Sequence, residues 1–115
     1  MERTDLTRIE HMIDAAESAL RFVNGRRREE LESDQMLTFA LTRAVEIVGE
    51  AASRVSPEGR AKMPGIAWNA VTAMRNRLVH AYFDVDRDIL WSTVIEALPR
   101  LLQQLRHVRE SGEEK

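Results

Sequence analysis

Apolar residues recur along this chain at intervals of three and four positions, the spacing that places side chains on one face of an α-helix. Each series predicts an amphipathic helix with one buried face. There are four such series, and the third runs from Ala67 to Ala81, with Trp68 one position off its apolar stripe. The four series are Leu6, Ile9, Ile13, Ala16, Leu20 and Val23; Leu37, Leu41, Ala44, Val48, Ala51 and Val55; Ala67, Val71, Met74, Leu78 and Ala81; and Leu90, Val94, Leu98, Leu101, Leu105 and Val108.

Polar residues that cap helices stand before these series. Thr4 or Asp5 can cap the first helix, Asp34 the second and Asp86 the last, because their oxygens accept from backbone N–H groups of the first turn. Asn24-Gly25 indicates the end of the first helix.

Glycine and proline predict the remaining breaks. In Ser56-Pro57-Glu58-Gly59, serine can cap, proline suits a first turn and glycine supplies a left-handed position. Met63-Pro64-Gly65 is a second break, and Pro99 should kink the last helix. Gly49, inside the second helix, costs roughly 1 kcal/mol relative to alanine, which suggests that another helix passes close by.

Four such helices with short connectors predict an all-α fold, an antiparallel bundle of four to five helices. The 115 residues suffice for one domain, which we expect over residues 1–110, with a disordered tail at 111–115. The absence of cysteine excludes disulfides and thiolate zinc sites. Because neither a signal peptide nor an apolar run near ~20 residues is present, we expect a cytoplasmic protein that does not enter a membrane.

The net charge of −2 argues against a protein that coats nucleic acid, but the charge is unevenly distributed. Residues 1–53 carry seven Arg/Lys and eleven Asp/Glu, residues 54–79 carry five and one, and residues 80–115 carry five and seven. The basic excess therefore lies in residues 54–79.

Several charged residues have a structural interpretation beside a functional one. The basic run Arg26–Arg28 can contact phosphate, yet we interpret it as the solvated face of a short helix with internal Arg–Glu pairs. Glu50 is exposed or orients the residues near position 75, and His11 is expected at the surface. His107 suits a helix end better than a ligand role. Helix capping explains the alternating Asp84, Asp86 and Asp88 at least as well as metal binding, so we predict no metal and no cofactor.

Candidate chemistry gathers near the end of the predicted third helix, in the sequence MRNRLVHAYFDVD. Arg75, His80 and Tyr82 supply a fixed cation, an imidazole that titrates near neutral pH and a phenol. In a straight helix Arg75 and His80 lie about 140° apart. Either the helix ends near His80, or the arginine reaches round, or a second copy brings its own pair alongside.

An imidazole that moves a proton and a guanidinium that grips a phosphate oxygen fit RNA cleavage, in which the substrate's 2′-hydroxyl is the nucleophile. The alternative is that Arg75 pairs with an acidic residue of a neighbouring helix, while His80 and Tyr82 merely finish the third helix.

The chain resembles a known family at these positions. RNRLVHAY matches the R-N-x-x-x-H-x-Y signature of the HEPN superfamily, in particular the HepT-like toxins, and the resemblance continues into FDVD and DILW. It extends to VEIVGEAA in the second helix and to the segment Pro64 to Trp68.

The resemblance implies a helical homodimer in which Arg75 and His80 of both copies form a metal-independent endoribonuclease acting on tRNA or mRNA. It implies a supporting role for Asn76, which helps to orient the pair. It also implies a toxin whose antitoxin, an MntA-type nucleotidyltransferase, transfers AMP from ATP to Tyr82. Two other functions stay open: a non-catalytic HEPN module that binds nucleotides or a nucleotidyltransferase partner, and a purely structural dimerisation unit.

Overall fold

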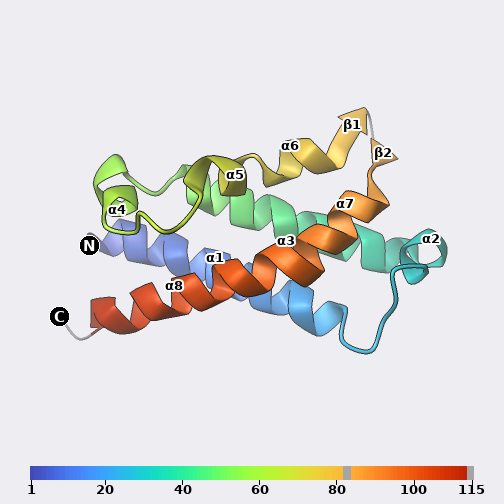
Figure 1. Ribbon diagram of the computed structural model, residues 1–115, viewed down its shortest axis with the longest axis horizontal. Helices are drawn as coiled ribbons and strands as arrows, with labels where there is room; N and C mark the ends of the chain where they lie inside the picture. The colour runs from blue at the N-terminus through green and yellow to red at the C-terminus, as the bar shows by residue number, and fades with distance from the viewer. Residues whose placement is uncertain (82–83, 114–115) are drawn as a thin grey trace.

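The computed structural model describes residues 1–81 and 84–113, with side chains described outside residues 79–81 and 111–113. The fold is a bundle of helical runs that alternate in direction along a 46 Å axis (Figure 1). α1 (Arg3–Phe22) packs against α3 (Gln35–Ser53) and α8 (Leu98–Glu113), while the short α2 (Glu30–Ser33) links α1 to α3. This arrangement confirms the prediction of an all-α antiparallel bundle.

The core lies where the predicted stripes meet. Ile9, Ile13, Leu41, Val48 and Leu105 are each fully buried, as expected from the three-four spacing of their helices. At 20–33 cal/mol per Å² of apolar surface, burial of such side chains is the main stabilising contribution to a bundle of this size.

A second layer of short helices lies along α3. α4 (Pro57–Ala61) follows the end of α3, and α5 (Trp68–Thr72) and α6 (Met74–Leu78) run back antiparallel to α3 (Figure 1). A Cβ placed on Gly49 would lie 3.5 Å from the carbonyl oxygens of both Val71 and Thr72. The inference of a close helix at Gly49 is therefore confirmed, and the passing element is α5.

The third helix ends earlier than predicted. α5 and α6 are separated at Ala73, and α6 stops at Leu78, so the expectation that one helix reaches Ala81 is wrong. The carbonyl of Leu78 accepts a hydrogen bond of 2.7 Å from the N–H of Asp86, a partner outside any helix. The chain then continues as β1 (Val79–Ala81), which pairs antiparallel with β2 (Asp84–Val85).

The last helical run contains an irregular turn. α7 (Arg87–Ser92) leads into the π-helical turn η1 (Thr93–Ala97), and α8 follows directly. Pro99 has no N–H and cannot donate to the carbonyl four residues earlier. The N–H of Leu98 donates to the carbonyl of Thr93, five residues back, which is the hydrogen bond of a π-helix. α8 continues to Glu113.

Most of the predicted caps are present. The carboxylate of Asp34 accepts from the N–H of Leu37, and that of Asp86 accepts from the N–H of Ile89 at 3.0 Å. Ser56 caps α4, and Gly25 adopts the left-handed conformation with φ of 74°.

The first helix departs from its predicted cap. α1 begins at Arg3, so neither Thr4 nor Asp5 caps it, and Asp5 is instead buried against the start of α4. Its carboxylate accepts from the N–H of Ser56 at 2.9 Å and from its hydroxyl at 2.6 Å. Gly59 is not left-handed; a Cβ there would lie 2.5 Å from the Asp5 carboxylate. Glycine is needed at this position for space.

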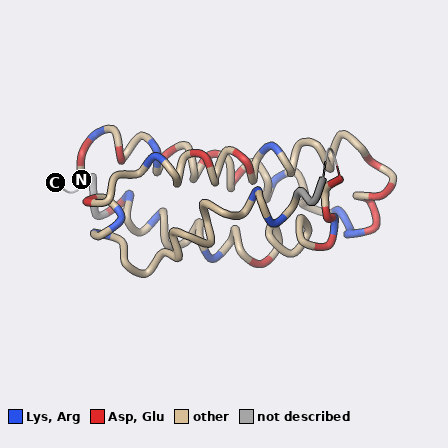
Figure 2. The backbone as a smooth tube through the Cα atoms, turned by 90° about the horizontal axis from the view of Figure 1, so that it is seen from above, with Lys and Arg blue, Asp and Glu red and all other residues tan. Residues whose placement is uncertain are grey.

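Basic and acidic residues are interspersed along the helices, as Figure 2 shows. Within residues 1–81 and 84–113, none of the helices has the length and hydropathy that spanning a bilayer requires.

Candidate active site

The buried residues of α6 decide which of its side chains face outward. Met74 and Leu78, four positions apart, are buried in the core and anchor one face of the helix. Arg75, Asn76 and Arg77 are consequently exposed. The motif therefore presents two guanidinium groups and an amide to solvent.

The guanidinium of Arg75 is held by a carboxylate from the neighbouring helix. Its Nε donates a hydrogen bond of 2.8 Å to Oε2 of Glu46 on α3, and the two side chains are 51% and 25% exposed. Because the bond uses Nε and half of the arginine surface stays open, the terminal nitrogens remain able to meet an anion.

Sequence reasoning missed Glu46, although a signal for it was present. α5 and α6 run antiparallel to α3, and Gly49 lies against the carbonyl of Thr72. One helical turn backward from Gly49 leads to Glu46, and one turn forward from Thr72 leads to Arg75. The close approach inferred at Gly49 thus fixes the register that pairs Glu46 with Arg75.

His80 lies in an extended segment, beyond the end of α6. Within the two-stranded ladder, Val79 is opposite Val85 and Ala81 is opposite Asp84, so His80 is the extra residue of a bulge-type irregularity. Of the three arrangements that the helical angle left open, the structure has the first: the helix ends and the chain turns. The side chain of His80 is outside the described structure, as is the whole of Tyr82.

The other charged residues singled out in the sequence make structural contacts. Arg26 and Arg28 form i,i+4 ion pairs with glutamates of α2, and Arg28 also contacts Asp88 at 2.7 Å. The predicted Arg–Glu pairs are therefore present, but Arg26–Arg28 lie in the connector before α2 and not on the helix itself. Glu50 is exposed and lies 3.7 Å from Arg43, so it is not the carboxylate that orients Arg75. His11 and His107 are both exposed.

Two of the alternating aspartates also have structural partners. Asp86 caps α7, and the carboxylate of Asp88 accepts from Nε of Arg28 at 2.7 Å. In the part of the chain that the structure describes, no cluster of three or more histidine, aspartate or glutamate side chains has the geometry to hold a metal ion.

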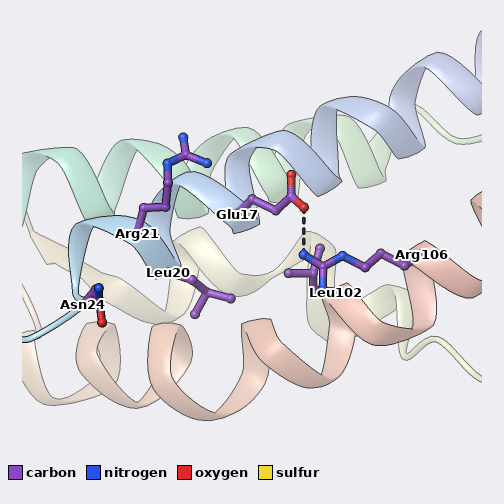
Figure 3. A pocket seen from close by; sticks show the side chains of 6 residues that line it. All are labelled: Glu17, Leu20, Arg21, Asn24, Leu102 and Arg106. Atoms are coloured by element: carbon purple, nitrogen blue, oxygen red, sulfur yellow. Dashed lines mark hydrogen bonds and ion pairs between the residues drawn. The ribbon is translucent and has the colours of Figure 1, made fainter.

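A separate groove of about 410 Å³ opens between α1 and α8, away from this motif (Figure 3). The carboxylate of Glu17 and the guanidinium of Arg106 meet across it at 2.7 Å, and Arg21 donates to Ser18 at 3.0 Å. The ion pair joins the two helices, whereas the bond between Arg21 and Ser18 lies within α1.

The fold and the exposed Arg75 and Asn76 of the R-N-x-x-x-H segment define a class of helical-bundle protein with a candidate site at the α6–β1 junction. A family model described as "Ribonuclease HepT-like" matches residues 12–108. The chain is 34% identical over 110 residues to a protein named "Probable ribonuclease HepT" from Thermococcus cleftensis, covering 96% of this chain and all of that one.

Two further relatives agree with that match. Proteins named "Putative RNase" from Caldanaerobacter subterraneus subsp. tengcongensis and Methanocaldococcus jannaschii are 33% and 30% identical. These matches cover 87% and 84% of this chain and 89% of each relative. No solved structure matches the chain significantly. The chain belongs to the HepT-like ribonuclease family.

Proposed function

We propose that this protein is an endoribonuclease that cleaves RNA without a metal ion and acts as the toxin of a toxin–antitoxin pair. The observation that carries the proposal is the family match over residues 12–108, combined with the half-exposed side chain of Arg75 on α6, five residues before His80. The basic excess of residues 54–79 supports RNA as the substrate, because positive charge attracts a phosphate backbone.

In the proposed mechanism His80 removes the proton from a ribose 2′-hydroxyl, whose oxygen attacks the adjacent phosphorus. The bond between phosphorus and the 5′-oxygen breaks, and that oxygen takes up a proton. The products are a 2′,3′-cyclic phosphate and a 5′-hydroxyl. Arg75 binds the non-bridging oxygens and stabilises the charge that develops on them, and Asn76 helps to orient the pair. The nucleophile belongs to RNA, so DNA is not cleaved.

A homodimer completes this proposal. Arg75 and His80 of two copies would face each other across a shared cleft, as the family resemblance implies. The exposure of Arg75 on the outer side of α6 is compatible with this assembly.

Neutralisation by a nucleotidyltransferase is the regulatory part of the proposal. An MntA-type partner would transfer AMP from ATP to the hydroxyl of Tyr82, with release of pyrophosphate. The added phosphate is negatively charged and two positions from His80, so it would compete with RNA for Arg75 by charge and volume.

Incubation of purified protein with tRNA and with mRNA in EDTA, beside a His80→Ala variant, tests the reaction. We expect the parent to produce ends with cyclic phosphate and the variant to produce none. Equal inactivity of both would refute the nuclease. For the regulatory step, ATP and the nucleotidyltransferase should add the mass of AMP to the parent and not to Tyr82→Phe. An equal mass increase in both would exclude Tyr82 as the acceptor.

A non-catalytic module that binds nucleotides or the nucleotidyltransferase is the second candidate. The ion pair between Arg75 and Glu46 favours it, because a structural arginine would make the same contact. RNA binding without cleavage by the parent, unchanged in His80→Ala, would support this candidate.

A further inference from the structure

A second groove lies on the opposite side of α6 from Glu46. It has a volume of about 230 Å³ and is lined by Arg77 of α6, by Ser92, Thr93, Glu96 and Ala97 of the α7–η1 segment, and by Arg100 of α8. One water occupies roughly 30 Å³ of liquid, so the groove has room for a phosphodiester group with part of its hydration shell.

The groove has a polar floor and two cationic walls. Thr93 is only 7% exposed, lines the groove, and makes no side-chain hydrogen bond to any described residue. Its hydroxyl oxygen is not one of the buried polar atoms that lack a partner, so it stays accessible to solvent and can bond to a ligand in the groove. Ala97 is small and leaves the space above it open.

The two arginines of the groove differ from the others near the motif. Arg75 is paired with Glu46, and Arg87 lies 3.8 Å from Glu32. Arg77 and Arg100 are exposed, and among the described residues neither has an acidic side chain within ion-pairing distance. Guanidinium groups without a carboxylate partner are the groups that bind phosphate most readily, through paired N–H donors.

Most of the groove is lined by one continuous helical run. Thr93, Glu96, Ala97 and Arg100 are spaced at three and four positions, so they form one stripe across η1 and the first turn of α8, facing α6. Arg77 lines the groove from the side of α6.

We propose that this groove binds a backbone phosphate of single-stranded RNA next to the scissile one, through Arg77, Arg100 and the hydroxyl of Thr93. The inference rests on the proposed ribonuclease function for the identity of the strand. Arg75 and Arg77 are about 160° apart around α6, so they contact different phosphates of a strand that crosses this helix. Glu96 supplies a negative charge at the rim, which limits binding and favours release of product.

Binding is measured separately from cleavage. The probe is a fluorescent single-stranded oligonucleotide with 2′-O-methyl riboses, which has no free 2′-hydroxyl and is not cleaved. Anisotropy at several salt concentrations gives the affinity and its salt dependence. Arg77→Gln and Arg100→Gln should each weaken binding about five- to tenfold and reduce the salt slope by about 0.7. Thr93→Val should weaken binding two- to fivefold, and Glu96→Gln should strengthen it by about the same factor.

Arg3→Gln is the matched control, because it removes the same charge from an exposed position in the first turn of α1. We expect it to bind like the parent, and circular dichroism should show that every variant is folded. If Arg77→Gln and Arg100→Gln weaken binding no more than Arg3→Gln, only net charge matters and the groove proposal is wrong. Absence of binding by the parent would also overturn it.

The two proposals fail in different ways. Oligonucleotide binding that depends on Arg77 and Arg100, without cleavage of unmodified RNA, supports the groove and refutes the nuclease. Cleavage whose KM is unchanged in both variants supports the nuclease and refutes the groove. If both are correct, the variants should raise KM with little change in kcat, because the contact lies away from the reacting bond.

Discussion

Gly49 should control the position of the candidate site, and we expect a small and a large replacement at this position to change the stability of the protein in opposite directions. An alanine Cβ would lie 3.5 Å from the carbonyl oxygens of Val71 and Thr72, which is an ordinary van der Waals contact. Glycine inside a helix is less stable than alanine by roughly 0.5–1 kcal/mol. Gly49→Ala should therefore raise the free energy of unfolding by about that amount and leave Arg75 in place.

Gly49→Leu should have the reverse effect. Its additional carbons extend beyond Cβ toward the same two carbonyls, so α5 must move away from α3, at a typical overpacking cost of 1–3 kcal/mol. Arg75 is one turn beyond the contact, and its bond to Glu46 would lengthen with the displacement. Misplacement by about 1 Å can cost as much as 10²-fold in rate. We expect cleavage to fall at least tenfold.

Urea denaturation followed by far-UV circular dichroism measures the stability of both variants, and RNA cleavage in EDTA measures the effect on the site. Alanine serves as the control for leucine, since both remove the glycine and only one overfills the space. If alanine destabilised the protein by more than about 1 kcal/mol, or if leucine left stability unchanged, then α5 would not rest on Gly49 as described.

Three further predictions concern single contacts. Asp5→Asn should lower the free energy of unfolding by about 1–2 kcal/mol, because the buried carboxylate accepts two hydrogen bonds from Ser56. Those bonds lower the pKa of Asp5 below its usual 3.8. The stability that the ionised Asp5 contributes is therefore present above pH 3.8 and is lost as the pH falls through the pKa of the folded state. Acid titration should show this loss of stability in the parent and not in the variant. Glu46→Ala should lower kcat about tenfold, while Glu46→Gln should retain most of it. Neither variant should shift Tm much, because exposed ion pairs contribute at most about 1 kcal/mol to stability. Equal kcat in the parent and both variants would show that Glu46 does not position Arg75. Asp34→Ala should cost about 1 kcal/mol, because it removes the cap of α3 together with the 2.6 Å ion pair to Arg26. Thermal unfolding measures this cost, and an unchanged Tm would show that neither contact stabilises the fold.

Features that depend on neighbouring residues could be predicted from the sequence. The apolar stripes place Leu41 and Leu105 in the core, and the caps at Asp34 and Asp86 follow from side chains that bond to the backbone three residues on. The conformation of Gly25 is similarly local, since an Asn-Gly pair tolerates positive φ. These elements are fixed by chemistry within a few positions of the chain.

Features that depend on distant partners were missed or misplaced. Asp5 looked like a local cap because nothing in its surroundings revealed Ser56, which is 51 residues away. α6 ends before His80 because the carbonyl of Leu78 bonds to Asp86, a contact made only when the chain folds back. The pairing of Arg75 with Glu46 likewise depends on the register between α6 and α3. Helical periodicity gives the buried face of each element and leaves these long-range partners undetermined.

The placement of the two ends of the chain has a practical consequence. The N-terminus and the end of α8 lie together at one end of the long axis, whereas the α6–β1 junction lies toward the other (Figure 1). A fluorescent label or a surface anchor fused at either end would therefore project away from the arginine-bearing helix. Immobilised protein should stay accessible to a long polynucleotide, which suits this molecule to single-molecule recording of its encounters with RNA.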